Sequence, residues 1–133
     1  MYSITVRNNI LIAHSLPGEV FGPAQNMHGA TYIVDAEFFA QNVNKYNIIM
    51  DLGVVTNILS EVLKFYSYKN LDEVDDFKGI ITSTEFLAKD IYDRICSKLK
   101  SNYYDDYQLL HKLKITLTES NVAWASFEQE IEK

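Results

Sequence analysis

The sequence predicts an α+β domain in which two helices cover one face of an antiparallel sheet. Two segments near the N-terminus and two near the C-terminus alternate apolar and polar residues, as half-buried strands do. Between them, apolar residues recur at steps of three and four, which is typical of amphipathic helices. The order strand, strand, helix, helix, strand, strand therefore predicts a four-stranded antiparallel sheet with both helices on one face.

Length and composition fit one domain over residues 1–133. With 47% hydrophobic residues and a formal net charge of -6, we expect a packed core and no basic surface for nucleic acid. The apolar runs are far shorter than a membrane span, so we expect no membrane partner and an N-terminus that forms a strand rather than a signal peptide. The single cysteine, Cys96, cannot form an intrachain disulfide, which favours a cytoplasmic protein. It falls within a predicted helix and is expected to be a small buried hydrophobe.

The N-terminal third predicts two long strands around a loop. Apolar residues keep one parity over residues 2–14, and the pattern leaves open whether Asn8 and Asn9 form a bulge. Residues 15–27 contain both prolines and two glycines, which predicts a loop. Alternation resumes over residues 28–38 and predicts the second strand.

The middle of the chain predicts the two helices. Apolar residues follow the helical period over residues 55–66 and again over residues 83–100. A polar, acidic stretch separates the two segments and predicts a connecting loop. Thr82 and Glu85 fit a capping box at the start of the second helix, and Asp51 fits an N-cap ahead of the first.

The C-terminal third returns to strands. A polar, tyrosine-rich loop is expected over residues 102–107. Residues 113–117 alternate, a turn follows at residues 119–121, and the last strand is predicted over residues 122–131. Such a sheet keeps one open face and two open edges, which a symmetric oligomer could cover and pair.

Two histidines are candidates for a metal site. His14 ends the first predicted strand and His28 begins the second, so antiparallel pairing would bring both imidazoles to one end of the sheet. Imidazole is a common metal ligand, but zinc is usually held by three or four protein groups. The pattern leaves two readings open: a metal site, or a pair of histidines that hydrogen-bond to backbone groups.

Six short segments, in order and spacing, resemble those of the 6-pyruvoyltetrahydropterin synthase and 6-carboxytetrahydropterin synthase family. They are Ile12-Ala13-His14-Ser15-Leu16, Met27-His28-Gly29-Ala30-Thr31-Tyr32, Ile49-Met50-Asp51-Leu52, Asn70-Leu71-Asp72, Thr82-Ser83-Thr84-Glu85-Phe86-Leu87-Ala88 and Leu117-Thr118-Glu119-Ser120. The family's segments read Ala-Ala-His, His-Gly-His-Asn-Tyr, Asp-Phe, Leu-Asp-His with a following Leu-Asn, Pro-Thr-Ser-Glu-Asn-Leu-Ala and Glu-Thr. Any one of these is weak evidence, but six in order are fairly specific, and they span most of the chain.

The resemblance implies the tunnelling fold, in which subunits pool their strands into an oligomeric barrel and place active sites at their interfaces. It implies a trimer or a dimer of trimers as the homo-oligomer. It also implies a lyase-type reaction that removes triphosphate from dihydroneopterin triphosphate and rearranges its side chain. For this the family uses three zinc-bound histidines, a cysteine thiolate as base, an Asp/His pair and a glutamate that binds the pterin ring.

Carried over by position, the resemblance implies that His14 and His28 are metal ligands and that Glu119 is the carboxylate that binds the ring. The third zinc histidine falls on Ala30, which has no donor atom. The segment before His28, residues 21–27, contains no cysteine, so the thiolate base is missing.

Other positions could contribute to the site. The family's Asp/His pair falls on Ser67 and Tyr68, so Tyr68 is a candidate catalytic residue. Glu19, in the loop between the histidines, is a second candidate and could act as a replacement metal ligand. Thr84 and Glu85, in the segment that resembles the family's Pro-Thr-Ser-Glu, are expected to contact the substrate in a secondary role.

Two functions remain open at this point. The first is a divergent synthase-like enzyme that acts on a pterin or related ring, with zinc or another metal on His14 and His28 and an altered activity. The second is a non-catalytic pterin-binding or oligomeric interaction protein that has lost the synthase chemistry. The retained histidines and Glu119 favour the first, and the missing catalytic groups favour the second.

Overall fold

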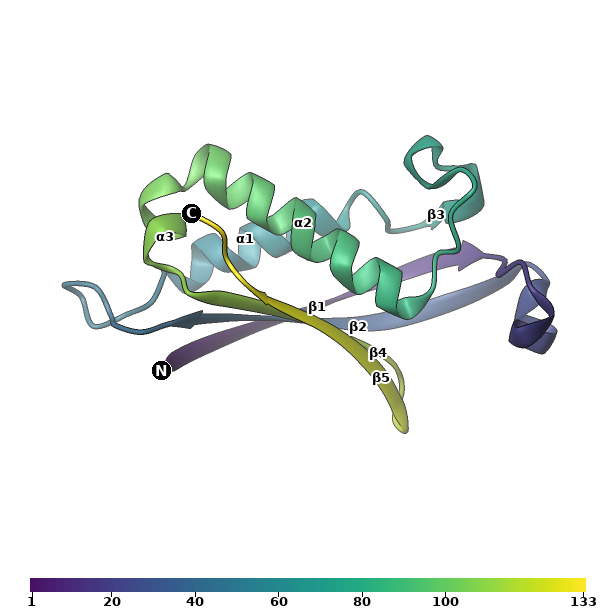
Figure 1. Cartoon of the computed structure of the whole chain (residues 1–133), viewed down its shortest axis with the longest axis horizontal. Helices are drawn as coiled ribbons and strands as arrows, with labels where there is room; N and C mark the ends of the chain where they lie inside the picture. The colour runs from purple at the N-terminus through teal and green to yellow at the C-terminus, as the bar shows by residue number, and fades with distance from the viewer.

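One sheet with helices on a single face forms the computed structural model, which describes all of residues 1–133 (Figure 1). Its strands are β1 (Tyr2–His14), β2 (His28–Ala40), β3 (Lys69–Asn70), β4 (Lys112–Ser120) and β5 (Ala123–Glu130), in the spatial order β3-β1-β2-β4-β5. Its helices are α1 (Leu52–Leu63), α2 (Thr84–Asn102) and α3 (Tyr104–Leu109), with the 3₁₀ turns η1 (Glu19–Gln25), η2 (Leu71–Glu73) and η3 (Asp75–Phe77). No helix has both the length and the apolar character needed to span a bilayer.

The predicted α+β class is confirmed, but the prediction of a four-stranded, purely antiparallel sheet is wrong. β3 adds a fifth strand, parallel to β1, through the pairs Ile12–Lys69 and Ala13–Asn70. A strand of two residues is too short to show an alternating pattern, so it could not be found in the sequence. The segment expected as one polar loop therefore contains β3, η2 and η3, and the tyrosine-rich loop contains α3.

The long pairing of β1 with β2 is the framework of the sheet. It runs without interruption from Tyr2 opposite Ala40 to His14 opposite His28, so there is no bulge at Asn8. The irregularity lies instead between β4 and β5, where the register shifts between Thr118 and Ser120. Uninterrupted pairing fixes the two histidines directly opposite each other at one end of the sheet.

The helices begin where side chains cap them. The Asp51 carboxylate accepts a hydrogen bond of 3.0 Å from the Val54 amide, which confirms Asp51 as the N-cap of α1. At α2 the N-cap is Ser83, whose hydroxyl accepts from the Phe86 amide at 3.1 Å. The expected capping role of Thr82 is therefore wrong, because the residue after it supplies the cap and leaves the Thr82 hydroxyl free for another contact.

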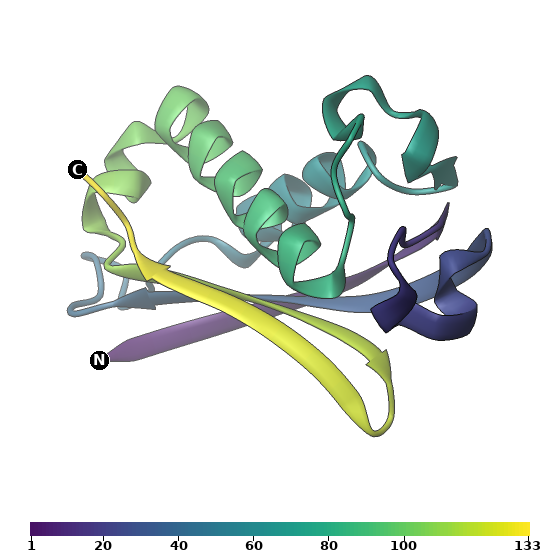
Figure 2. The same ribbon diagram turned by 45° about the vertical axis from the view of Figure 1, so that its right-hand side comes forward.

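The core lies between the sheet and the helices and contains 30 buried hydrophobic residues. The other face of the sheet carries polar ladders rather than a second core. Arg7 forms a bidentate ion pair with Asp35 at 2.7 and 3.0 Å, and Lys112 pairs with Glu128 at 2.8 Å. The open face is therefore polar and charged over much of its length, and Figure 2 shows that no helix crosses it.

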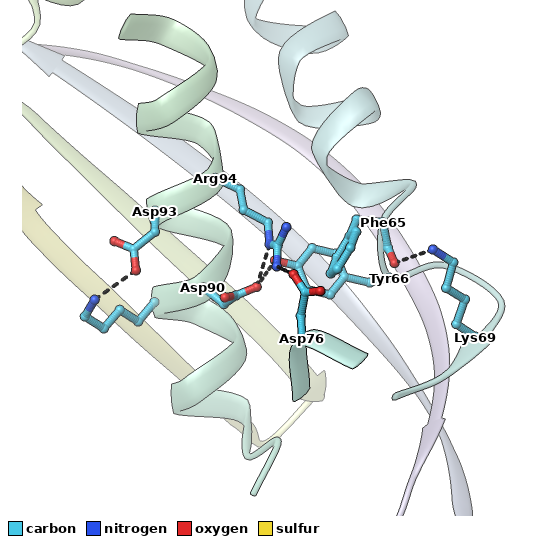
Figure 3. Close-up of polar contacts among 8 residues, drawn as sticks. Phe65, Tyr66, Lys69, Asp76, Asp90, Asp93 and Arg94 are labelled. Atoms are coloured by element: carbon cyan, nitrogen blue, oxygen red, sulfur yellow. Dashed lines mark hydrogen bonds and ion pairs between the residues drawn. The ribbon is translucent and has the colours of Figure 1, made fainter. Parts of the chain in front are cut away.

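A polar cluster on the helical layer ties α2 to the segments before it (Figure 3). Arg94 donates to Asp90 at 2.8 Å and to Asp76 at 3.0 Å. The hydroxyl of the buried Tyr66 donates to the same Asp90 carboxylate at 2.5 Å, and the Arg94 guanidinium stacks 3.7 Å from the ring centre of Phe65. The Arg94 side chain thus holds together η3, the segment that follows α1, and the middle of α2.

We expect Arg94→Met to lower the free energy of unfolding by about 1–3 kcal/mol, because Asp90 would keep a half-buried charge with one partner fewer. Lys89→Met is the matched control on the same helix, since its ion pair with Asp93 is exposed on both sides. The control should change stability by less than about 0.5 kcal/mol. Urea denaturation of the three proteins measures this, and equal midpoints would contradict the role of Arg94.

Candidate functional site

The histidine pair lies at the end of the β1–β2 ladder. The His14 and His28 rings are 4.6 Å apart between centroids and meet edge to face at 63°. His28 is half-buried and its Nδ1 lies 2.9 Å from the Asn26 carbonyl oxygen. A carbonyl can only accept, so Nδ1 of His28 carries the proton of this bond, and in the neutral ring the Nε2 lone pair stays free.

His14 is more deeply enclosed, with 1% of its surface exposed. Its Nδ1 lies 3.0 Å from the hydroxyl of Thr82, a contact that no motif in the sequence predicts. Burial lowers the pKa of His14, the neighbouring His28 lowers it further, and Asp72 and the Thr82 backbone oppose the shift. A neutral imidazole at neutral pH follows, which is the form that binds metal ions.

Asp72 closes this end of the site from the side of η2. Its carboxylate accepts from the backbone amide of Ser15 at 3.0 Å and from the Ser15 hydroxyl at 2.5 Å. Asn70 in turn accepts from the Asp72 amide at 3.1 Å and caps η2. These bonds fix the backbone directly after His14, while Thr82 fixes its ring.

The donor set fits a two-histidine site and does not complete a three-histidine one. Both imidazoles have an oxygen partner at Nδ1, as metal-binding histidines usually do, and neither Nε2 has a hydrogen-bond partner. Ala30, the position implied for a third ligand, offers only a methyl group. No third His, Cys, Asp or Glu side chain joins the pair to form a cluster that could hold a metal ion.

Glu19 and Tyr68, the two candidate catalytic residues, lie apart from the expected ring-binding residues. Glu19 is exposed at the start of η1, and its role stays a prediction. Tyr68 precedes β3, is 84% exposed, and donates its backbone N–H to the Leu11 carbonyl at 2.6 Å. Its φ of 62° lies in the left-handed region, which is rare for an aromatic residue.

The three expected substrate-binding residues lie together. Thr84 and Glu85 from the first turn of α2 and Glu119 from the end of β4 line one open pocket of about 230 Å³, together with residues 123–125 of β5. Thr84 and Glu85 reach it because α2 starts over the end of β4, while Glu119 reaches it from the start of the β4–β5 hairpin, whose turn points away from the helices in Figure 2. The pocket therefore has two carboxylates, a hydroxyl and an aromatic rim at Trp124.

A buried tyrosine, Tyr32 on β2, lies close to the polar residues of the pocket, although the alternation of its strand indicates only a core position. Tyr32 is 1% exposed, and its hydroxyl is near enough to Thr84, Glu85 and Glu119 for all three to influence its pKa. Burial raises the pKa of Tyr32, the Thr84 side chain opposes the shift, and the carboxylates of Glu119 and Glu85 raise the pKa further. The hydroxyl thus stays protonated beside two acidic groups and can donate a hydrogen bond. Its strand parity gave no signal of this role, because a tyrosine on the inner face is usually core.

Cys96 lies on α2, packed against the core and away from both the histidines and the pocket. It contacts Tyr92 and lines a separate hollow with Tyr107 and Ile131. Burial raises the pKa of Cys96 to about 11. The thiol is therefore a partly buried hydrophobe, close to expectation, and does not replace the missing catalytic thiolate.

We expect iodoacetamide to label Cys96 at pH 8 on the order of a hundredfold more slowly in the folded protein than in urea, where the thiol pKa returns to about 8.5. Folding raises the thiol pKa, so between about pH 8.5 and 11 the unfolded chain loses this proton more readily than the folded one. The free energy of unfolding therefore falls as the pH rises through this range. Mass spectrometry of timed samples measures the labelling rate. Equal rates in the folded and unfolded states would contradict the burial of the thiol.

Comparisons with known proteins agree on one family. Its sequence model, described as 6-pyruvoyl tetrahydropterin synthase, matches residues 3–130. A 6-pyruvoyl tetrahydrobiopterin synthase of Dictyostelium discoideum is 30% identical over an alignment of 105 residues that covers 77% of this chain and 73% of that protein. Among solved structures, the Caenorhabditis elegans 6-pyruvoyl tetrahydropterin synthase superposes with a TM-score of 0.81 at 21% identity, over 96% of this chain and 95% of that one. The Plasmodium falciparum protein of the same name gives 0.80 at 14% identity, over 98% of each chain.

Proposed function

The chain belongs to the 6-pyruvoyl tetrahydropterin synthase family, and on that premise we propose that it binds a pterin or related bicyclic ring in the pocket of Thr84, Glu85 and Glu119. The observation that carries this proposal is the meeting of these three residues, from two distant segments, around one pocket. Glu119 is the residue that the family resemblance aligns with the ring-binding carboxylate.

The chemistry of the pocket favours a ring edge rich in N–H donors. A carboxylate accepts two parallel hydrogen bonds from a guanidine-like edge, and such charge-assisted pairs are stronger than neutral ones. Glu85 and Glu119 together repel phosphate from this end, so a phosphorylated side chain would have to point elsewhere. Trp124, 64% exposed at the rim, offers an apolar surface to a flat ring.

The proposal includes a lyase-type reaction assisted by a metal ion on His14 and His28, with zinc as the first candidate. When bound, such an ion would polarise hydroxyl or carbonyl oxygens of the substrate. The third ligand would be water, substrate or Glu19. Because Ala30 and residues 21–27 lack the family's third histidine and cysteine, we expect an activity that differs from the family's own reaction.

A second function stays open, in which the protein binds the ring without turning it over. It is favoured by the missing third histidine and cysteine and by the placement of Tyr68, which lies outside the pocket of Glu119 within one chain. One missing acid–base group alone costs about 10²- to 10⁴-fold in rate. We also propose a homo-oligomer, a trimer or a dimer of trimers, because most of the outer edge of β1 and the whole outer edge of β5 have no partner strand.

We expect Glu119→Gln to weaken neopterin binding about 10- to 100-fold, because a neutral amide cannot accept two charge-assisted hydrogen bonds from the ring edge. Isothermal titration calorimetry at neutral pH measures the affinity. Glu132→Gln is the matched control, since it removes the same charge at an exposed C-terminal position and should bind as the parent does.

The two functions separate in a turnover assay with dihydroneopterin triphosphate. Release of inorganic triphosphate by the parent and its loss in Glu119→Gln would support the enzyme. Tight neopterin binding with no release would select the binding protein. No neopterin binding by the parent would contradict both.

We expect metal-free purification followed by zinc titration to give about one zinc per chain, and His28→Ala to lose it, because one imidazole cannot hold the ion alone. His28 is the better target than His14 because its ring is only half-buried and its removal disturbs the core less. If Glu19 is the third ligand, Glu19→Ala lowers the zinc content as His28→Ala does. Unchanged zinc in Glu19→Ala would contradict that role.

A further inference from the structure

His14 and Thr82 stand out among the buried side chains. Of the 32 buried residues, only these two have polar side chains other than the tyrosines, and each is 1% exposed. Their side chains contact each other, with 3.0 Å between His14 Nδ1 and Thr82 Oγ1. Polar groups that are buried this deeply are costly unless they are paired, so the contact fixes the position of both.

The Thr82 hydroxyl has no hydrogen-bond partner other than His14. Ser83 caps α2, so Thr82 is not needed as a cap.

The contact also determines which nitrogen of His14 is available. With Nδ1 paired to Thr82, only Nε2 remains for a ligand. His28 is in the same state, because its Nδ1 pairs with Asn26. The two rings, 4.6 Å apart between centroids, thus each keep Nε2 as the unpaired nitrogen.

We propose that Thr82 is a positioning residue whose hydroxyl accepts the Nδ1 proton of His14 and so holds the ring with its Nε2 lone pair free. The effect of Thr82 on substrate or metal binding rests on the function proposed above. The hydrogen bond between Thr82 and His14 does not depend on that function. Because Thr84 lies two residues further on and lines the ring-binding pocket, the start of α2 joins the histidine pair to that pocket.

Long-range ¹H–¹⁵N NMR of the imidazoles at pH 8 tests this inference in the parent, Thr82→Val and Thr82→Ser. In the parent we expect a His14 Nδ1 that carries the proton and an Nε2 that does not. Thr82→Val keeps the shape but removes the acceptor, so its two ¹⁵N shifts should move towards each other or exchange. Thr82→Ser keeps the hydroxyl and should retain the parent pattern, and His28 should be unchanged in all three proteins.

A parent His14 that carries its proton on Nε2 would overturn the inference, even if Thr82→Val does not fold. Parent-like His14 shifts in a folded Thr82→Val would overturn it as well. We expect zinc affinity to fall about 10- to 100-fold in Thr82→Val and to stay near the parent value in Thr82→Ser. Failure of the parent to bind zinc or neopterin would instead contradict the proposed function and leave the His14–Thr82 hydrogen bond standing.

Discussion

The site depends on the unbroken pairing of β1 with β2. Thirteen residues of each strand pair in one register, and the last pair is His14 with His28. A slip of one residue would turn every side chain of β2 to the other face, taking Tyr32 out of the core and His28 away from His14. The register is fixed because the inward residues of β2, such as Val34 and Phe38, are fully buried. The same strand register therefore buries the core residues of β2 and places His28 opposite His14.

The start of α2 connects the histidine pair with the pocket of Glu119, which the sheet alone would leave separate. Thr82 contacts His14, Ser83 caps the helix, and Thr84 and Glu85 line the pocket. Four consecutive residues therefore serve three purposes, and each depends on where the helix begins. Below this point Leu87 and Ala88 are fully buried, so the helix cannot shift along its axis without losing core contacts. The packing of α2 in this way positions both halves of the site.

The sequence predicted the periodic parts of this fold and missed the aperiodic ones. Long strands and amphipathic helices leave a pattern, so β1, β2 and α2 were found within a few residues of their ends. β3 and the 3₁₀ turns have no such pattern, because they are held by single contacts such as the Tyr68 amide to the Leu11 carbonyl. For the site, spacing identified residues that do lie together, including Glu119 with Glu85. It could not show that the Thr82 hydroxyl faces His14, because that depends on which neighbouring residue caps the helix.

The placement of Tyr68 gives a physical reason to connect the site with assembly. In the sheet order, β3 and β4 are three strand spacings apart, about 15 Å, so the side chains of Tyr68 and Glu119 cannot meet within one chain. They lie near opposite edges of the sheet, and both of those edges have unpaired backbone groups. If copies of the chain pair edge to edge, Tyr68 of one copy approaches the β4–β5 side of the next. The proposed oligomer would then add an aromatic hydroxyl to a pocket that already has its carboxylates, and a monomer would be left with the pocket alone.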